Sequence, residues 1–185
     1  MDHHNFDVMP APIITPLPCF ADNRGWFMPV REKKNPHDGR PWVQGNVSMS
    51  YRGVLRGLHF QHPGGQAKLL TVLQGEIFDV VVDIRRDSSE FGKAQCLTLR
   101  AADKQQLFIP RGYAHGFFVF SESAIVHYKV DNEWALAHEH TLCWSDPQLG
   151  ISWPLTTDPI LSAKDAAGRS LHSFTEDELP TMTGD

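Results

Sequence analysis

Short runs of β-branched, aromatic and aliphatic residues alternate with turn residues along most of the chain, and helical periodicity is nearly absent. Runs bounded by Gly, Pro, Asp and Ser are typical of β-strands. Many short strands at this spacing indicate an all-β barrel or sandwich. The sequence predicts strands at about residues 11–16, 43–50, 53–60, 68–73, 76–85, 94–100, 106–109, 114–120, 123–131 and 140–144.

The C-terminal part differs from this pattern. The stretch "TDPILSAKDAAGRSL" predicts a short helix that begins after Ser162, since serine is a preferred N-cap. No internal repeat, low-complexity tract or linker interrupts the chain. We therefore expect a single domain over residues 1–185, with a barrel core at about 40–150 and flexible tails at 1–10 and 175–185.

Residues 76–85, "EIFDVVVDIR", show how a strand divides its side chains between two faces. Phe78 and the three alternate residues after it share one face, whereas Asp79 and Asp83 lie on the other with Ile77 and Val81. Carboxylates among aliphatic residues favour a partly polar barrel interior, in which a buried charge must be paired. A solvated face explains the pattern equally well at this point.

Composition and charge narrow the possible functions. The formal net charge is −5, which argues against general binding to nucleic acids. The three cysteines lack zinc or redox spacing and are interpreted as reduced thiols of a cytoplasmic protein. The N-terminus has no signal-peptide core, and no apolar run approaches the roughly 20 residues of a membrane helix.

Three residues are candidates for proton chemistry. His59 in "RGLHFQHPGGQAK" titrates near neutrality, so it can serve as a general base. Lys68 lies beyond the Pro-Gly-Gly turn and could stabilise an anion, and Tyr128 shares a face with Val126 and Val130 and could donate a proton. Taken one at a time, each has a simpler structural explanation: a hydrogen-bonded histidine, an exposed turn lysine and a buried tyrosine.

Regular alternation would place Arg56 and His59 on opposite faces of their strand. Two explanations remain open at this point: Gly57 marks a β-bulge, or Arg56 reaches around an edge.

A metal site is not expected. The Pro-x-Gly turn and His115 of "IPRGYAHGF" are features of cupin barrels, many of which bind metals. The first motif here reads His59-Phe60-Gln61-His62, however, so three or four ligands cannot be assembled.

Taken together, the motifs identify a family. "DNRGWF", "RGLHFQ", "QAKL", "FIPRGYAHGF", "YKV" and "WPLTTDPILSAKDA", in this order, resemble the dTDP-4-dehydrorhamnose 3,5-epimerases, over about residues 12–168. The resemblance implies a metal-free cupin jelly-roll β-barrel without a cofactor. It also implies a homodimer, in which an N-terminal strand pairs with the partner and lends residues to its site.

The resemblance also implies roles for single residues. His59 would be the base, Asp165 the carboxylate that orients it, Lys68 the cation facing the sugar ketone, and Tyr128 the proton donor. The implied contacts to the nucleotide diphosphate or sugar are Arg24, Arg56, His115, Glu139 and Lys164, with Trp134 stacking on the base and Gln44 and Asn46 retained from a binding motif.

Three positions depart from the family pattern: Pro29, Gly45 and Val47. The departures bear on the nucleotide base, the sugar and the number of carbons inverted. The predicted function is inversion of C3 and C5 in dTDP-4-keto-6-deoxy-glucose, giving dTDP-4-keto-L-rhamnose. The alternatives are a single-carbon epimerase, a non-catalytic sugar-nucleotide-binding cupin and a metal-dependent cupin oxygenase.

Overall fold

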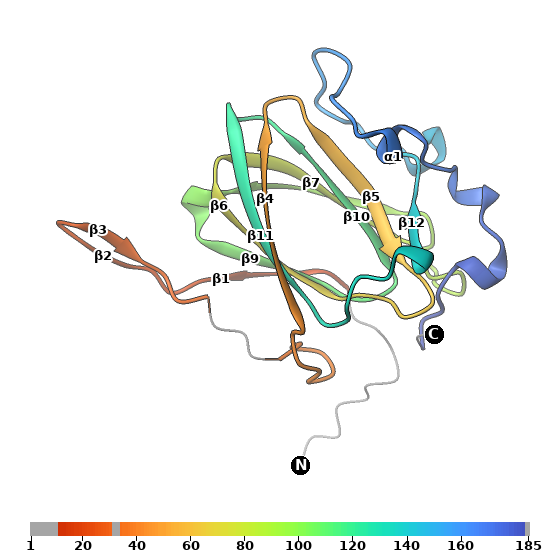
Figure 1. The fold of residues 1–185 in the computed structure, drawn as a ribbon, viewed down its shortest axis with the longest axis horizontal. Helices are drawn as coiled ribbons and strands as arrows, with labels where there is room; N and C mark the ends of the chain where they lie inside the picture. The colour runs from red at the N-terminus through yellow and green to blue at the C-terminus, as the bar shows by residue number, and fades with distance from the viewer. Residues whose placement is uncertain (1–10, 31–33, 184–185) are drawn as a thin grey trace.

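The computed structural model describes residues 11–30 and 34–183, and within them the chain forms two five-stranded antiparallel sheets that face each other (Figure 1). The first sheet has the order β1 (Ile13–Pro16), β9 (Gln105–Ile109), β6 (Lys68–Gln74), β11 (Ser123–Val130) and β4 (Gln44–Tyr51). The second has the order β12 (Glu139–Thr141), β5 (Leu55–Gln61), β10 (Tyr113–Val119), β7 (Glu76–Asp83) and β8 (Ala94–Arg100).

The space between the sheets holds the main hydrophobic core. Alternate residues of β6, β9 and β11 point inward from the first sheet, among them Leu70, Leu107 and Val126. They pack against Val81 of β7 and Phe117 of β10. This period-two burial is the reason why the apolar alternation in the sequence predicts these strands.

A second core covers the outer face of the second sheet. Leu58, Val80 and Val82 pack there against Leu142 and Phe174 from the C-terminal part of the chain. The C-terminal segment lies along this side in Figure 1, together with α1 (Ala163–Ala166) and the 3-10 helices Pro147–Leu149, Leu171–Ser173 and Glu176–Glu178. Because both faces of β5, β7 and β10 are covered, most residues of these strands are buried, polar ones included.

The C-terminal boundary differs from the expectation. Residues 175–183 do not form a free tail, because Leu179 is buried in the second core and the amide of Arg86 donates to the carbonyl of Pro180 at 3.0 Å. The amide of Met182 also donates to Asp87 at 2.7 Å. The sheet also begins before residue 40, since β1 belongs to it. The other expected tail, residues 1–10, lies outside the described residues.

Each predicted strand run overlaps a strand, and Ser162 caps α1 by accepting from the amide of Asp165 at 3.1 Å. The all-β class and the short C-terminal helical segment are therefore confirmed. A hairpin of β2 (Phe20–Asp22) and β3 (Gly25–Phe27), which extends away from the barrel in Figure 1, was not predicted from the sequence. Its residues are all exposed, so no alternating burial marks them.

The charged face of β7 is buried, so the solvated alternative is wrong. Asp79 and Asp83 are 0% and 2% exposed. Asp83 accepts from Arg85 Nε at 2.8 Å, and Arg85 in turn donates to the hydroxyl of Tyr113 at 2.7 Å. Asp79 meets His115 instead, as described below.

Candidate active site

A β-bulge shapes the strand that carries His59. His115 of β10 pairs with His59, and Phe117 pairs with Arg56, so three steps along β5 oppose two along β10. Gly57 lies in the bulge with φ +114°, and a Cβ there would come within 2.6 Å of Gly116 Cα. The bulge alternative is therefore confirmed, and it lets Arg56 and His59 face the same cavity.

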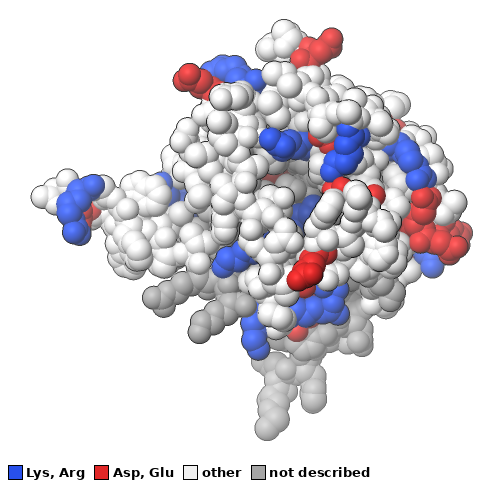
Figure 2. All heavy atoms as spheres, viewed as in Figure 1, with Lys and Arg blue, Asp and Glu red and all other residues white. Residues whose placement is uncertain are grey.

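This cavity has a volume of about 420 Å³ and opens between the two sheets. Figure 2 shows a hollow on this face, with lysine or arginine atoms inside it and at its rim. Its size is that of a small-molecule site. Ten of the predicted site residues line it: Gln44, Asn46, Arg56, His59, Lys68, His115, Tyr128, Trp134, Glu139 and Lys164.

His59 is held by a buried carboxylate. Its Nε2 lies 2.5 Å from Asp165 Oδ1, and Asp165 also accepts from the hydroxyl of Ser162 at 2.7 Å. Because Asp165 is an acceptor when ionised, Nε2 carries the proton and Nδ1 keeps the lone pair. The arrangement is that of a base oriented by a carboxylate.

The surroundings lower the pKa of both members of this pair. Burial lowers the pKa of His59, and the charges of Lys164 and Lys68 lower it further, against the opposing effect of Asp165. Burial alone would raise the pKa of Asp165, but hydrogen bonds from His59 and Ser162 outweigh this and the pKa falls. At neutral pH the site therefore holds a neutral imidazole beside a carboxylate.

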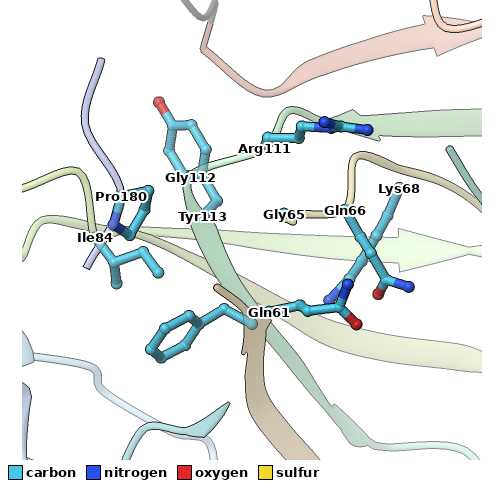
Figure 3. Close-up of a pocket in the computed structure, with 10 residues that line it drawn as sticks. Gln61, Gly65, Gln66, Lys68, Ile84, Arg111, Gly112, Tyr113 and Pro180 are labelled. Atoms are coloured by element: carbon cyan, nitrogen blue, oxygen red, sulfur yellow. The ribbon is translucent and has the colours of Figure 1, made fainter. Parts of the chain in front are cut away.

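Lys68 lies deep in the cavity as a buried cation. Its Nζ donates to the carbonyl of His59 at 3.2 Å. Burial lowers its pKa to about 8, although the charges of Asp79 and Glu139 act in the opposite direction. Lys68 and Gln66 also line a second space, of about 10 Å³. Gln61 and Arg111 line the same space (Figure 3). Such a space has room for about one water molecule.

Tyr128 faces His59 from the other wall of the barrel. It lies on β11 of the first sheet, whereas His59 lies on β5 of the second, and both line the cavity. Burial raises the pKa of Tyr128; the charge of Arg56 opposes this and that of Glu139 adds to it. The phenol therefore keeps its proton at neutral pH and can act as an acid.

Polar side chains form the rim. Lys164 Nζ donates to Glu139 at 2.8 Å, so α1 and β12 are joined beside His59. Gln44 donates to Asn46 at 2.7 Å, and Arg56 Nε donates to Ser50 at 2.9 Å. Trp134 also lines the cavity, and its side chain is largely exposed.

Two predicted residues lie outside the cavity lining. Asp165 lies behind His59 and contacts its Nε2, where the orienting role that the resemblance implies would place it. Arg24 lies in the β2–β3 hairpin, where its side chain is 86% exposed and pairs with Asp22 at 2.6 Å. The structure therefore does not bring Arg24 together with the other predicted residues of this chain.

Several lining residues were not predicted as site residues, among them Ser48, Gln66 and Phe117. The buried Asp79 was not predicted as a site residue either. Asp79 could have been found, because it is a carboxylate among aliphatic residues on the inward face of a strand. Ser48 also follows the alternation of Gln44 and Asn46. Gln66 follows a turn and gives no such signal. Within the described ranges, no group of three or more His, Cys, Asp and Glu side chains could hold a metal ion.

Comparison with known proteins identifies the family. The family model for dTDP-4-dehydrorhamnose 3,5-epimerase matches residues 8–173. The chain belongs to this family. It is 46% identical over 155 residues to the Pseudomonas aeruginosa dTDP-4-dehydrorhamnose 3,5-epimerase, covering 82% of this chain and 86% of that one. It is 48% identical over 155 residues to the Neisseria gonorrhoeae epimerase, covering 82% of this chain but spanning only 47% of that relative's length.

The solved structures agree with the family. The Legionella pneumophila epimerase, crystallised in complex with dTDP-4-keto-L-rhamnose, superimposes with a TM-score of 0.88 at 40% identity, covering 92% of this chain and 93% of that one. The predicted family, its cupin-type jelly-roll barrel and its enzyme class, an isomerase, are thereby confirmed. Across residues 11–30 and 34–183, every helix is too short or too polar to cross a membrane.

Proposed function

We propose that the protein inverts C3 and C5 of dTDP-4-keto-6-deoxy-glucose, giving dTDP-4-keto-L-rhamnose for dTDP-rhamnose biosynthesis. The observation that carries this proposal is the placement of a base, His59, and an acid, Tyr128, on opposing sheets around one cavity. Inversion at carbon requires a proton to leave one face and another to arrive on the opposite face. The activity named for the relatives supports the choice of substrate.

The first step is proton abstraction beside the C4 ketone. Nδ1 of His59 takes the proton from the carbon, the C–H electrons form a C=C bond, and the carbonyl electrons move to oxygen as an enolate. Asp165 stabilises the imidazolium that results. The buried ammonium of Lys68 stabilises the enolate oxygen in a site of low dielectric.

The second step returns a proton from the other wall. The enolate collapses to the ketone while its carbon takes the hydroxyl proton of Tyr128, which leaves a phenolate near the charge of Arg56. His59 then loses its proton to solvent and Tyr128 regains one, so the protein ends in its starting state. Turning or reseating the sugar would present the second carbon to the same pair.

Tyr128→Phe separates the two steps. Without the phenol, His59 still exchanges the proton, but delivery from the opposite face is lost, so we expect deuterium uptake from D2O with inversion reduced by about 10²-fold or more. Proton NMR of the sugar measures both. Tyr51→Phe, the same change on an exposed tyrosine of β4, is the matched control. Normal inversion in Tyr128→Phe would remove Tyr128 from the mechanism.

The pH profile tests Lys68. Its pKa of about 8 predicts that kcat/KM, which reports the free enzyme, falls as pH rises above about 8, because the ammonium is lost. Lys68→Arg keeps the positive charge, because the guanidinium stays protonated. The pH at which kcat/KM falls should therefore rise by about two units or more, even if the rate itself is lower. Lys129→Arg is the control. If the fall of kcat/KM stays at the same pH in Lys68→Arg, the titration belongs to another group.

Two of the three departures from the family pattern, Gly45 and Val47, lie on β4 and leave its cavity wall intact. Gly45 and Val47 are exposed on the outward face, whereas Gln44, Asn46 and Ser48 alternate with them and line the cavity. This supports binding of the same class of sugar nucleotide. Trp134 offers its face to the nucleobase, and Arg56 and Lys164 offer positive charge to the diphosphate.

We further propose a cytoplasmic homodimer. Among the described residues, β1 and β4 are the edge strands of the first sheet, and the edge of β1 could take a strand from a partner. The hairpin exposes Phe20, Trp26 and Phe27, which a monomer would present to water, and carries Arg24 away from its own cavity. Docking on a partner would cover these aromatics and could bring Arg24 to the partner's site.

A further inference from the structure

Two histidines of the second sheet lie side by side, and each is paired with a carboxylate. His59 and His115 are directly opposite each other in the β5–β10 register, and both line the cavity. Each presents Nε2 to a carboxylate, Asp165 at 2.5 Å for His59 and Asp79 at 2.8 Å for His115. The mechanism above uses the first pair and leaves Asp79 without a role.

Asp79 is the more deeply buried of the two carboxylates. It is 0% exposed, and within the described part of the chain its Oδ1 has no hydrogen-bond partner. A buried carboxylate with one unsatisfied oxygen is costly unless a cation is near. The nearby cation is Lys68, on which Asp79 acts more strongly than any other charged group does.

We propose that Asp79 is a positioning residue: its carboxylate holds the His115 ring with Nε2–H toward β7 and supplies the negative charge opposite the ammonium of Lys68. His115 then presents the lone pair of Nδ1 to the cavity beside His59, and accepts rather than donates a hydrogen bond there. Asp79 thus acts on two groups: it fixes the tautomer of His115, and it favours the charged form of Lys68, the cation that faces the ketone oxygen. The catalytic part of this inference rests on the proposed function.

Several other groups face Lys68 and contribute to its charge state. Glu139 favours the ammonium, whereas Lys164 and burial disfavour it. The remaining groups around the cavity are Arg56 and His59 from β5, His115 from β10 and Tyr128 from β11. Removing only the charge of Asp79 should therefore lower the titration midpoint of Lys68 from about 8 by about one unit, since a near opposite charge has gone.

The test is a titration of Lys68 followed by the NMR signal of its Cε, assigned with Lys68→Arg. Asp79→Asn should lower the midpoint by about one unit. The matched control is Asp83→Asn, the same change on the same face of β7, at a carboxylate that is equally buried but pairs with Arg85. Asp83→Asn should leave the midpoint of Lys68 unchanged. Equal midpoints in wild type and Asp79→Asn, or an equal shift in both variants, would overturn the proposal.

A second measurement needs no substitution of Asp79. Nitrogen-15 NMR of the neutral His115 ring in the wild-type protein should show the proton on Nε2, and a proton on Nδ1 would overturn the proposal. Neither measurement depends on turnover, so both can succeed if the proposed reaction is wrong. If the reaction is correct, the falling limb of kcat/KM should shift downward in Asp79→Asn together with the Lys68 midpoint, and an unmoved limb would contradict the catalytic role.

Discussion

Replacing His59 with asparagine should lower kcat/KM for epimerisation by about 10²–10⁴-fold, the contribution expected of a positioned general base. Asparagine is too short to reach Asp165 in place of Nε2, but Asp165 still accepts from the hydroxyl of Ser162 at 2.7 Å, so the carboxylate keeps a partner and the fold is expected to persist. No nitrogen at this position could then accept the carbon-bound proton. Proton NMR of the sugar nucleotide in D2O measures the loss as absent deuterium uptake.

The control for this prediction is His127→Asn. His127 lies on β11 next to Tyr128 in the chain and therefore on the opposite face of that strand. Activity close to wild type is expected there. If His59→Asn still exchanged deuterium at the wild-type rate, another group would be the base and the assignment of His59 would be withdrawn.

Gly57→Ala should reduce the free energy of unfolding by about 2–5 kcal/mol, the sum of backbone strain and overpacking. At φ +114° a side chain is disfavoured, and the new Cβ would lie 2.6 Å from Gly116 Cα and 2.7 Å from the carbonyl oxygen of His115. These are backbone atoms of β10, so relief requires the two strands to move apart. Urea unfolding followed by fluorescence measures the loss.

Gly25→Ala separates the two causes. Gly25 has a similar φ of +130°, but no atom lies within 4 Å of its added Cβ. Its loss of stability should therefore reflect strain alone and be smaller. Equal losses in the two variants would contradict the close approach of β5 and β10. Gly57→Ala should also lower activity. The bulge directs the side chains of Arg56 and His59 toward the same cavity, and a disturbed bulge would displace them.

Most of the fold could be predicted from local pattern. The alternation in residues 76–85 appears directly in the burial of β7, and Ser162 caps α1 because its hydroxyl satisfies a free amide. The hairpin of β2 and β3 could not be found this way, because neither strand has a buried face. The docking of residues 175–183 also depends on distant partners, such as the amide of Arg86, which no local signal shows.

The candidate site shows the same division. His59, Lys68 and Tyr128 belong to recognisable motifs, and the structure brings them to one cavity. The partnership of His115 with Asp79 joins residues 36 positions apart through the register of β10 on β7, and this register is a property of the sheet rather than of either motif. The sequence left two explanations open for Arg56 and His59, a bulge at Gly57 or a side chain that reaches around an edge. Only the pairing of β5 with β10 decides between them.

The measurement that tests the central claim most directly is proton NMR of dTDP-4-keto-6-deoxy-glucose incubated with the wild-type protein in D2O. An acid and a base on opposite walls of one cavity predict deuterium at both C3 and C5, with inverted configuration at each. Deuterium at a single carbon would indicate a single-carbon epimerase. No exchange at any carbon would contradict the proposed reaction and favour a protein that only binds sugar nucleotides.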